Sequence, residues 1–107
     1  MHKINDFAYT LIDKLEQMYI EDDFDGELQD LFEEYEDKIT KHCKELYPNG
    51  DVCIWDYDPE YDNCNLEEKL QDILEYLNGK TLLDSNMSTL EDVLMITVVT
   101  KKGVNNA

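Results

Sequence analysis

The sequence predicts a mainly α-helical fold, a small bundle of three or four helices built by one domain over residues 1–107. Two observations lead to this expectation. Apolar residues recur at three- and four-residue spacings over long segments, which is the pattern of helices with one buried face. Capping residues, glycine and proline stand at the ends of these segments. The chain is long enough for one hydrophobic core but not for two.

The first two segments are long and strongly periodic. An apolar stripe from Ile4 to Tyr19 predicts a helix over about residues 3–21. A crowd of acidic residues and Gly26 follow, a composition that ends one helix and caps the next. A second stripe then runs to Leu46 and stops at Pro48, which predicts a helix over about residues 26–46.

The third predicted helix covers about residues 66–78. Asn65 stands three residues before Glu68, which is the spacing of a capping box. Gly79 follows the last apolar position, where glycine commonly ends a helix. Both ends of this segment are therefore marked.

The last segment has two interpretations. Ser88 and Glu91 have capping-box spacing, and lysines close the segment, so we expect a fourth helix there. Residues 93–100 are nevertheless rich in β-branched side chains. They could instead pair with the aromatic segment 52–57 as a two-stranded β-ribbon, which would make the fold α+β.

Charge is the most informative property of the composition. The chain has 26 acidic residues against 9 basic ones, all of them lysine, and a formal net charge of −17. Such a charge repels nucleic acid and anionic membranes and attracts basic protein surfaces. We therefore expect a basic protein partner and no direct binding to nucleic acid or membrane. The absence of a signal-like or membrane-spanning apolar run predicts a cytoplasmic protein.

Residues 21–37 contain ten acids and no basic residue. Four of these acids share one face of the second predicted helix at i, i+3, i+4 and i+7 spacing: Asp30, Glu33, Glu34 and Asp37. A carboxylate then recurs roughly every 5 Å along the axis, comparable with the phosphate spacing of about 3.4 Å along a DNA strand. The same surface is expected to include Glu21, Asp22, Asp23, Asp25 and Glu27. The alternative is an ordinary solvated helix face.

A second acidic block interleaves acids with aromatic rings. Its acids are Asp56, Asp58, Glu60 and Asp62, and its aromatic residues are Trp55, Tyr57 and Tyr61. Aromatic rings among charges often anchor interfaces, so we expect the block to contact the partner. The alternative is that the rings cover the core beneath a loop.

The sequence gives no reason to expect a metal, a cofactor or catalysis. Asp23, Asp25 and Gly26 fall at the third, fifth and sixth positions of a calcium-binding loop. Phe32 then occupies the twelfth position, where the motif needs a bidentate glutamate. The three cysteines lack C-x-x-C spacing, which predicts reduced thiols. His42 and Cys43 are neighbours on a helix and point apart, so they form no catalytic dyad.

In charge, size and lack of catalytic groups, the chain resembles the phage-encoded acidic DNA-mimic proteins that inhibit restriction or CRISPR enzymes. The resemblance covers composition and includes no motif. It implies that the protein occupies the DNA- or guide-binding groove of a host defence nuclease in the bacterial cytoplasm. An immunity protein or antitoxin against a nuclease toxin is the alternative, and a non-catalytic adaptor is the third. A homodimer through Trp55, Tyr57, Tyr61 and the apolar run 93–99 stays open.

Overall fold

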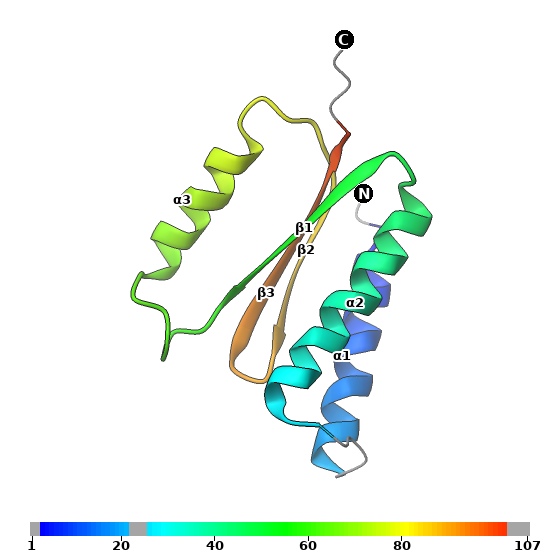
Figure 1. Ribbon diagram of the computed structural model, residues 1–107, viewed down its shortest axis with the longest axis vertical. Coiled ribbons are helices and arrows are strands. Elements are labelled where there is room, and N and C mark those ends of the chain that lie inside the picture. The colour runs from blue at the N-terminus through cyan, green and yellow to red at the C-terminus, as the bar shows by residue number, and fades with distance from the viewer. Residues whose placement is uncertain (1–2, 22–25, 103–107) are drawn as a thin grey trace.

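The computed structural model describes residues 3–21 and 26–102, in which three helices accompany one three-stranded antiparallel sheet. Along the chain these are α1 (Asn5–Ile20), α2 (Leu28–Leu46), β1 (Gly50–Tyr57), α3 (Leu66–Leu77), β2 (Leu82–Leu90) and β3 (Val93–Lys101) (Figure 1). The prediction of a mainly α-helical bundle is therefore wrong. The protein has an α+β fold.

The expected fourth helix is a β-hairpin instead. Ser88 does not cap a helix: its hydroxyl donates to the Asn86 side chain at 2.6 Å within β2. Glu91 lies in the turn between β2 and β3 with a φ of 54°. The β-branched run that follows forms β3, because Val, Ile and Thr pack well on a pleated surface and lose rotamer freedom in a helix.

The three predicted helices are confirmed, with ends close to the expected ones. Asn65 caps α3 by accepting a hydrogen bond from the Glu68 backbone at 2.8 Å. Gly79 follows α3 with a φ of 79°, a conformation that glycine adopts without steric cost. Strong periodicity and clear capping residues were sufficient to place these elements.

The strand order is β1-β3-β2, so β3 is the central strand. It pairs with β1 from Gly50–Lys101 to Tyr57–Leu94 and with β2 from Leu82–Thr100 to Leu90–Val93. The pairing of residues 93–100 with 52–57, which the sequence left open, is present, but it belongs to a three-stranded sheet and not to the two-stranded ribbon considered there. β3 is buried on both faces, which explains why it is mostly apolar instead of alternating apolar and polar residues, although Thr97 and Thr100 are also buried in it.

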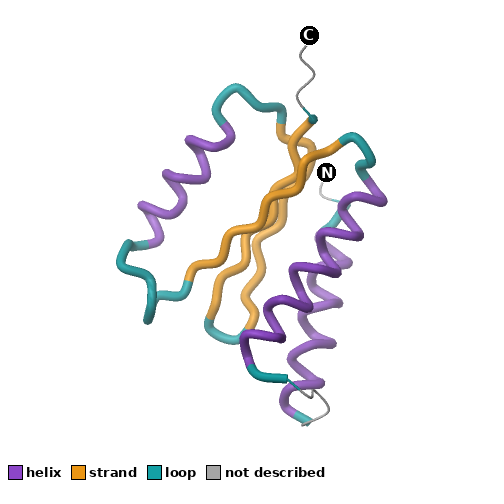
Figure 2. The backbone as a smooth tube through the Cα atoms, viewed as in Figure 1, coloured by secondary structure: helices purple, strands orange, loops and turns teal. Residues whose placement is uncertain are grey.

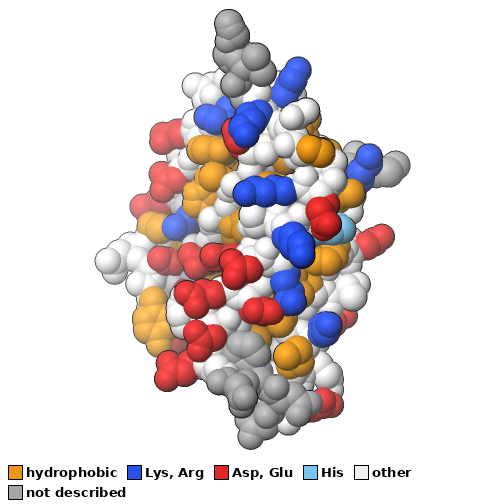
Figure 3. Space-filling model, turned by 45° about the vertical axis from the view of Figure 1, so that its right-hand side comes forward, with side chains coloured by type: hydrophobic (Ala, Val, Ile, Leu, Met, Phe, Trp, Pro, Cys, Tyr) orange, Lys and Arg blue, Asp and Glu red, His pale blue; other side chains and the backbone are white. Residues whose placement is uncertain are grey.

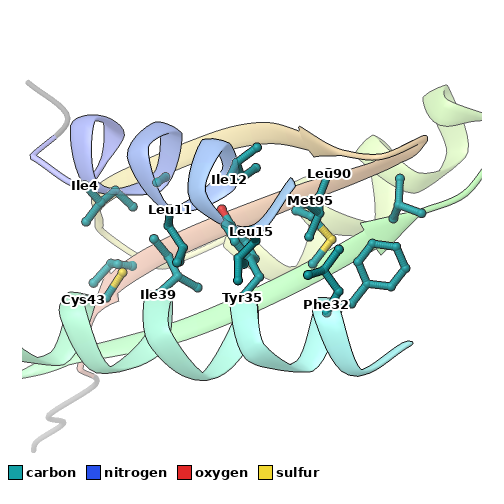
Figure 4. Packing of buried hydrophobic residues seen from close by; sticks show 14 residues of the cluster. Ile4, Leu11, Ile12, Leu15, Phe32, Tyr35, Ile39, Cys43, Leu90 and Met95 are labelled. Atoms are coloured by element: carbon teal, nitrogen blue, oxygen red, sulfur yellow. The ribbon is translucent and has the colours of Figure 1, made fainter. Parts of the chain in front are cut away.

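Two helices cover one face of the sheet and the third lies on the other (Figures 1 and 2). α1 packs against β2, and α2 packs against α1 and β1. Between them lies the main core, which includes Leu15, Tyr35, Ile39 and Met95 (Figure 4). On the opposite face, Trp55 meets Tyr76 of α3 edge to face, with ring centroids 5.1 Å apart. No helix in the described ranges is long and apolar enough to cross a bilayer.

Candidate protein-binding surface

The acidic row predicted along α2 is only partly available for a partner. Glu27 and Asp30 form a capping box at the start of α2, in which the Glu27 backbone donates to the Asp30 carboxylate at 2.9 Å. Glu34 pairs with Lys38 at 3.1 Å, one helical turn away. The row is therefore not the unbroken, uncompensated stripe that its spacing predicts. Glu33 and Asp37 remain exposed on the helix surface.

Glu36 joins the two acidic blocks. Partial burial raises its pKa, and the charges of Asp56, Asp37 and Glu33 raise it further. The strongest of these charges, that of Asp56, comes from β1, so the fold brings the second acidic block against the first. We call Glu33, Glu36 and Asp37 of α2, together with Asp56 of β1, the acidic junction.

Charge is segregated along α2. Five of its six acids occupy the N-terminal half, whereas Lys38, Lys41 and Lys44 occupy the C-terminal half together with the sixth acid, Glu45. Figure 3 shows the charges on this face of the molecule, where acidic side chains gather mainly on the left and lower left and lysines run from the top through the middle to the lower right. The negative charge is therefore concentrated on one side of the face.

A groove of about 660 Å³ lies between α2 and β1 and connects the two halves. We call it the β1 groove; it is lined by Glu36, Asp37, Thr40, Lys41, Lys44, Glu45, Val52 and Ile54. Val52 and Ile54 are only half-buried although they point toward the helices. The groove therefore has an apolar floor beneath charges of both signs.

The acids that follow β1 organise their own loop. The Asp58 backbone donates to the Asp62 carboxylate at 2.7 Å, and the Asp58 carboxylate accepts from the Glu60 backbone at 3.0 Å. Such bonds are typical of turns built by aspartate. Tyr61, at the tip of this loop, is 81% exposed, which leaves it accessible to a partner.

Two of the aromatic residues predicted to anchor a partner are engaged inside the fold. Trp55 is half-buried against Tyr76, and Tyr57 is buried with its hydroxyl donating to the Cys64 carbonyl at 3.2 Å. Residues 93–99, expected as part of a self-association face, belong to the central strand β3. These positions support the alternative reading in which the rings cover the core.

The first acidic block extends beyond the described residues. Glu21 ends α1 and accepts a hydrogen bond from the Gln17 side chain at 2.7 Å. Asp22, Asp23 and Asp25, which complete the predicted block, lie outside the described ranges. Of the acids that the sequence analysis expected to contact a partner, the acidic junction contains Glu33, Asp37 and Asp56.

The cysteine and histidine side chains of α2 are packed into the fold. Burial raises the pKa of Cys43 to about 11, and the Asp84 carboxylate adds to this shift, so the thiol stays protonated at neutral pH. The His42 ring stacks on Phe7 at 3.9 Å and does not face Cys43 as a dyad would. Cys43, Cys53 and Cys64 form no disulfide within the described part of the chain. In the described part of the chain, no three His, Cys, Asp or Glu side chains converge as a metal site.

Comparison of the chain with protein-family models, curated proteins and solved structures finds no match. The α+β class therefore comes from the structure, and the surface has to be interpreted from its own residues.

Glu36 is the residue of the acidic junction that spacing alone did not single out. It lies next to Tyr35, at the border of the buried stripe of α2, so it does not share the i, i+3, i+4, i+7 row. This border position could have identified Glu36, because a carboxylate at the edge of a buried helix face lies close to the element that packs on that face. The lysines of α2 were a second unused signal, since they all fall after residue 37.

Proposed function

We propose that this protein binds a basic, nucleic-acid-binding surface of a partner protein through the acidic junction and thereby blocks that surface. A host defence nuclease of the restriction or CRISPR type is the partner class that we favour. The observation that supports the proposal most directly is the convergence of Asp56 of β1 on Glu33, Glu36 and Asp37 of α2, whose charges add to the effect of burial in raising the pKa of Glu36.

Electrostatics gives the reason for such an arrangement. Like charges held close together destabilise a folded protein, and Glu36 also loses hydration through partial burial. Lysine or arginine side chains of a partner would relieve this repulsion and would speed the encounter by electrostatic steering. A surface that normally holds phosphates offers such cations at suitable spacing.

A capture experiment tests the proposal. Immobilised wild-type protein is incubated with bacterial lysate at low salt, beside a variant with Glu33→Gln, Asp37→Asn and Asp56→Asn. We expect the wild type to retain nucleic-acid-binding proteins that elute with salt or with added DNA, and the variant to retain far less of them. A second control, Asp13→Asn, Asp72→Asn and Glu75→Gln, removes the same charge from helices α1 and α3 and should retain them.

The outcome decides between partner classes. Equal retention by all three proteins, or no displacement by DNA, would contradict binding through the acidic junction. Recovery of a toxin nuclease would instead assign the protein to the immunity class, and inhibition of the recovered enzyme in a cleavage assay would establish the block.

A further inference from the structure

The outer edge of β1 is open to pairing with another strand. β1 ends the sheet, so one row of its backbone N–H and C=O groups has no strand partner in the described chain. Natural edge strands are commonly blocked by bulges, prolines or charged side chains. β1 has no bulge, proline or lysine and pairs with β3 at eight consecutive positions from Gly50 to Tyr57; its charged residues, Asp51 and Asp56, lie toward its two ends and leave the middle of the edge uncharged. The opposite edge, β2, is irregular between Leu82 and Asp84.

The side chains beside this edge are incompletely covered. Val52 and Ile54 point toward the helix layer and pack on the core, yet both are only half-buried because the β1 groove lies beside them. A strand added to β1, with a helix above it, would continue both layers of the fold. Burial of these apolar side chains would stabilise the addition.

The charges along the β1 groove indicate what kind of partner helix could pack beside α2. Glu36 and Asp37 lie at one end of it, and Lys41, Lys44 and Glu45 lie toward the other, where the lysines outnumber the acid. A tight turn joins α2 to β1, with the Gly50 backbone donating to the Tyr47 carbonyl at 2.9 Å, so the two elements run in opposite directions (Figure 1). A complementary partner therefore carries a helix with an acidic half and a lysine-rich half, oriented antiparallel to α2.

We propose that the partner at this edge is a second copy of the chain, paired through β1 in an antiparallel, two-fold symmetric dimer. A two-fold axis perpendicular to the sheet keeps both α2 helices on the same face and reverses one relative to the other. The acids of each α2 then meet the lysines of its mate. Directly opposed residues must share a face of the sheet, so the axis lies at a residue position and not between two. The longest pairing then has the axis at one of the two middle residues of β1, Cys53 or Ile54.

This pairing yields a continuous six-stranded sheet with four helices of the two copies side by side on one face. It differs from the homodimer that the sequence left open, because Tyr57 and β3 stay inside each copy. The dimer covers Glu36 and Asp37, which also belong to the acidic junction, so the partner of the proposed function would have to displace the second copy. The test of the dimer needs no other protein, so the two proposals can fail separately.

Sedimentation velocity of the full chain provides the test. At about 0.15 M salt the Debye length is about 8 Å, so the net repulsion of two acidic copies is screened while contacts at the interface persist. We expect a species with twice the 12.6 kDa mass of one chain. Asp37→Lys and Lys44→Glu should each raise the dimer dissociation constant at least tenfold. Combining the two changes should restore it to within about threefold of the wild type, because opposite charges face each other again.

Lys14→Glu is the matched control. Lys14 lies on α1 and does not line the β1 groove, and its substitution changes the net charge as much as Lys44→Glu does. It should leave the dissociation constant unchanged. Far-UV circular dichroism establishes that each variant is folded. Amide hydrogen exchange at increasing concentration should slow in Asp51–Tyr57 and not in β2.

Two results would overturn the proposal. One is a monomer at every concentration up to about 0.5 mM. The other is a dimer that the single variants and their combination leave unchanged, or one whose protection from exchange appears in β2, since either finding would place the contact at another surface.

Discussion

The Tyr47 hydroxyl donates a hydrogen bond of 2.8 Å to the buried carboxylate of Asp84. The same carboxylate oxygen accepts from the backbone N–H groups of Lys3 and Ile4 at 2.8 and 3.2 Å, at the start of α1. One side chain of β2 thus ties the end of α2 to the beginning of α1. The two backbone N–H groups lie at the start of α1 and have no acceptor within the helix, so the Asp84 carboxylate replaces the water that they would otherwise bind.

Loss of this carboxylate should destabilise the protein strongly. Asp84→Ala leaves buried donors unpaired, and we expect the free energy of unfolding to fall by about 3 kcal/mol or more. Tyr47→Phe removes one bond to a charged acceptor and should cost about 2 kcal/mol. Urea unfolding measures both changes. Tyr19→Phe removes a hydroxyl from a tyrosine that is 38% exposed and should change stability by less than about 0.5 kcal/mol.

The same contact should make stability depend on alkaline pH. Burial and the hydrogen bond to Asp84 raise the pKa of Tyr47 to about 12, above the value of about 10 for an unfolded tyrosine. The folded state then holds the phenolic proton more tightly, so its stabilising contribution is complete below pH 10 and is lost as the pH rises toward 12. The stability advantage of the wild type over Tyr47→Phe should shrink over that interval. A difference that stays constant from pH 9 to pH 11.5 would contradict this assignment.

Glu36 should act against stability. Because burial and the neighbouring carboxylates raise its pKa, the ionised form is disfavoured in the folded state, and this penalty develops as the pH rises through the raised pKa. Glu36→Gln should therefore stabilise the protein at pH 7, by only about 0.5 kcal/mol since solvent screens a half-buried group. Thermal unfolding at pH 7 and pH 3.5 measures the effect, which should vanish at the lower pH. Glu60→Gln, on the exposed loop, should show no such pH-dependent gain.

Trp55 is the single tryptophan of the chain, so its emission reports how α3 docks. Tyr76→Ala removes the ring that it meets edge to face and should shift the emission to longer wavelength. The lost ring contact should also cost about 1 kcal/mol. Leu74→Ala, on the same helix but 61% exposed, should leave the emission unchanged. An unchanged spectrum in Tyr76→Ala would mean that α3 does not shield Trp55.

Gly50 has no room for a side chain. A Cβ atom built there lies 2.7 Å from the Val99 side chain and 3.1 Å from that of Tyr47. Gly50→Ala should therefore destabilise the protein by about 1–3 kcal/mol through overpacking at the start of β1. Gly79→Ala meets no atom within 4 Å, and its φ of 79° should cost only about 1 kcal/mol. Chemical denaturation of the two variants separates these causes.

The sequence by itself determined the three helices and their caps, because the apolar period of a helix and the residues at its ends act within one turn of chain. It also determined that the surface is acidic. It did not determine the strands. The β-branched run at 93–100 forms a strand because β1 and β2 pair with it on either side and helices cover both of its faces. Which acids gather was likewise decided by tertiary structure. Asp56 reaches Glu36 only because β1 folds back against α2, whereas Asp30 and Glu34 are taken up by a cap and a lysine within their own helix.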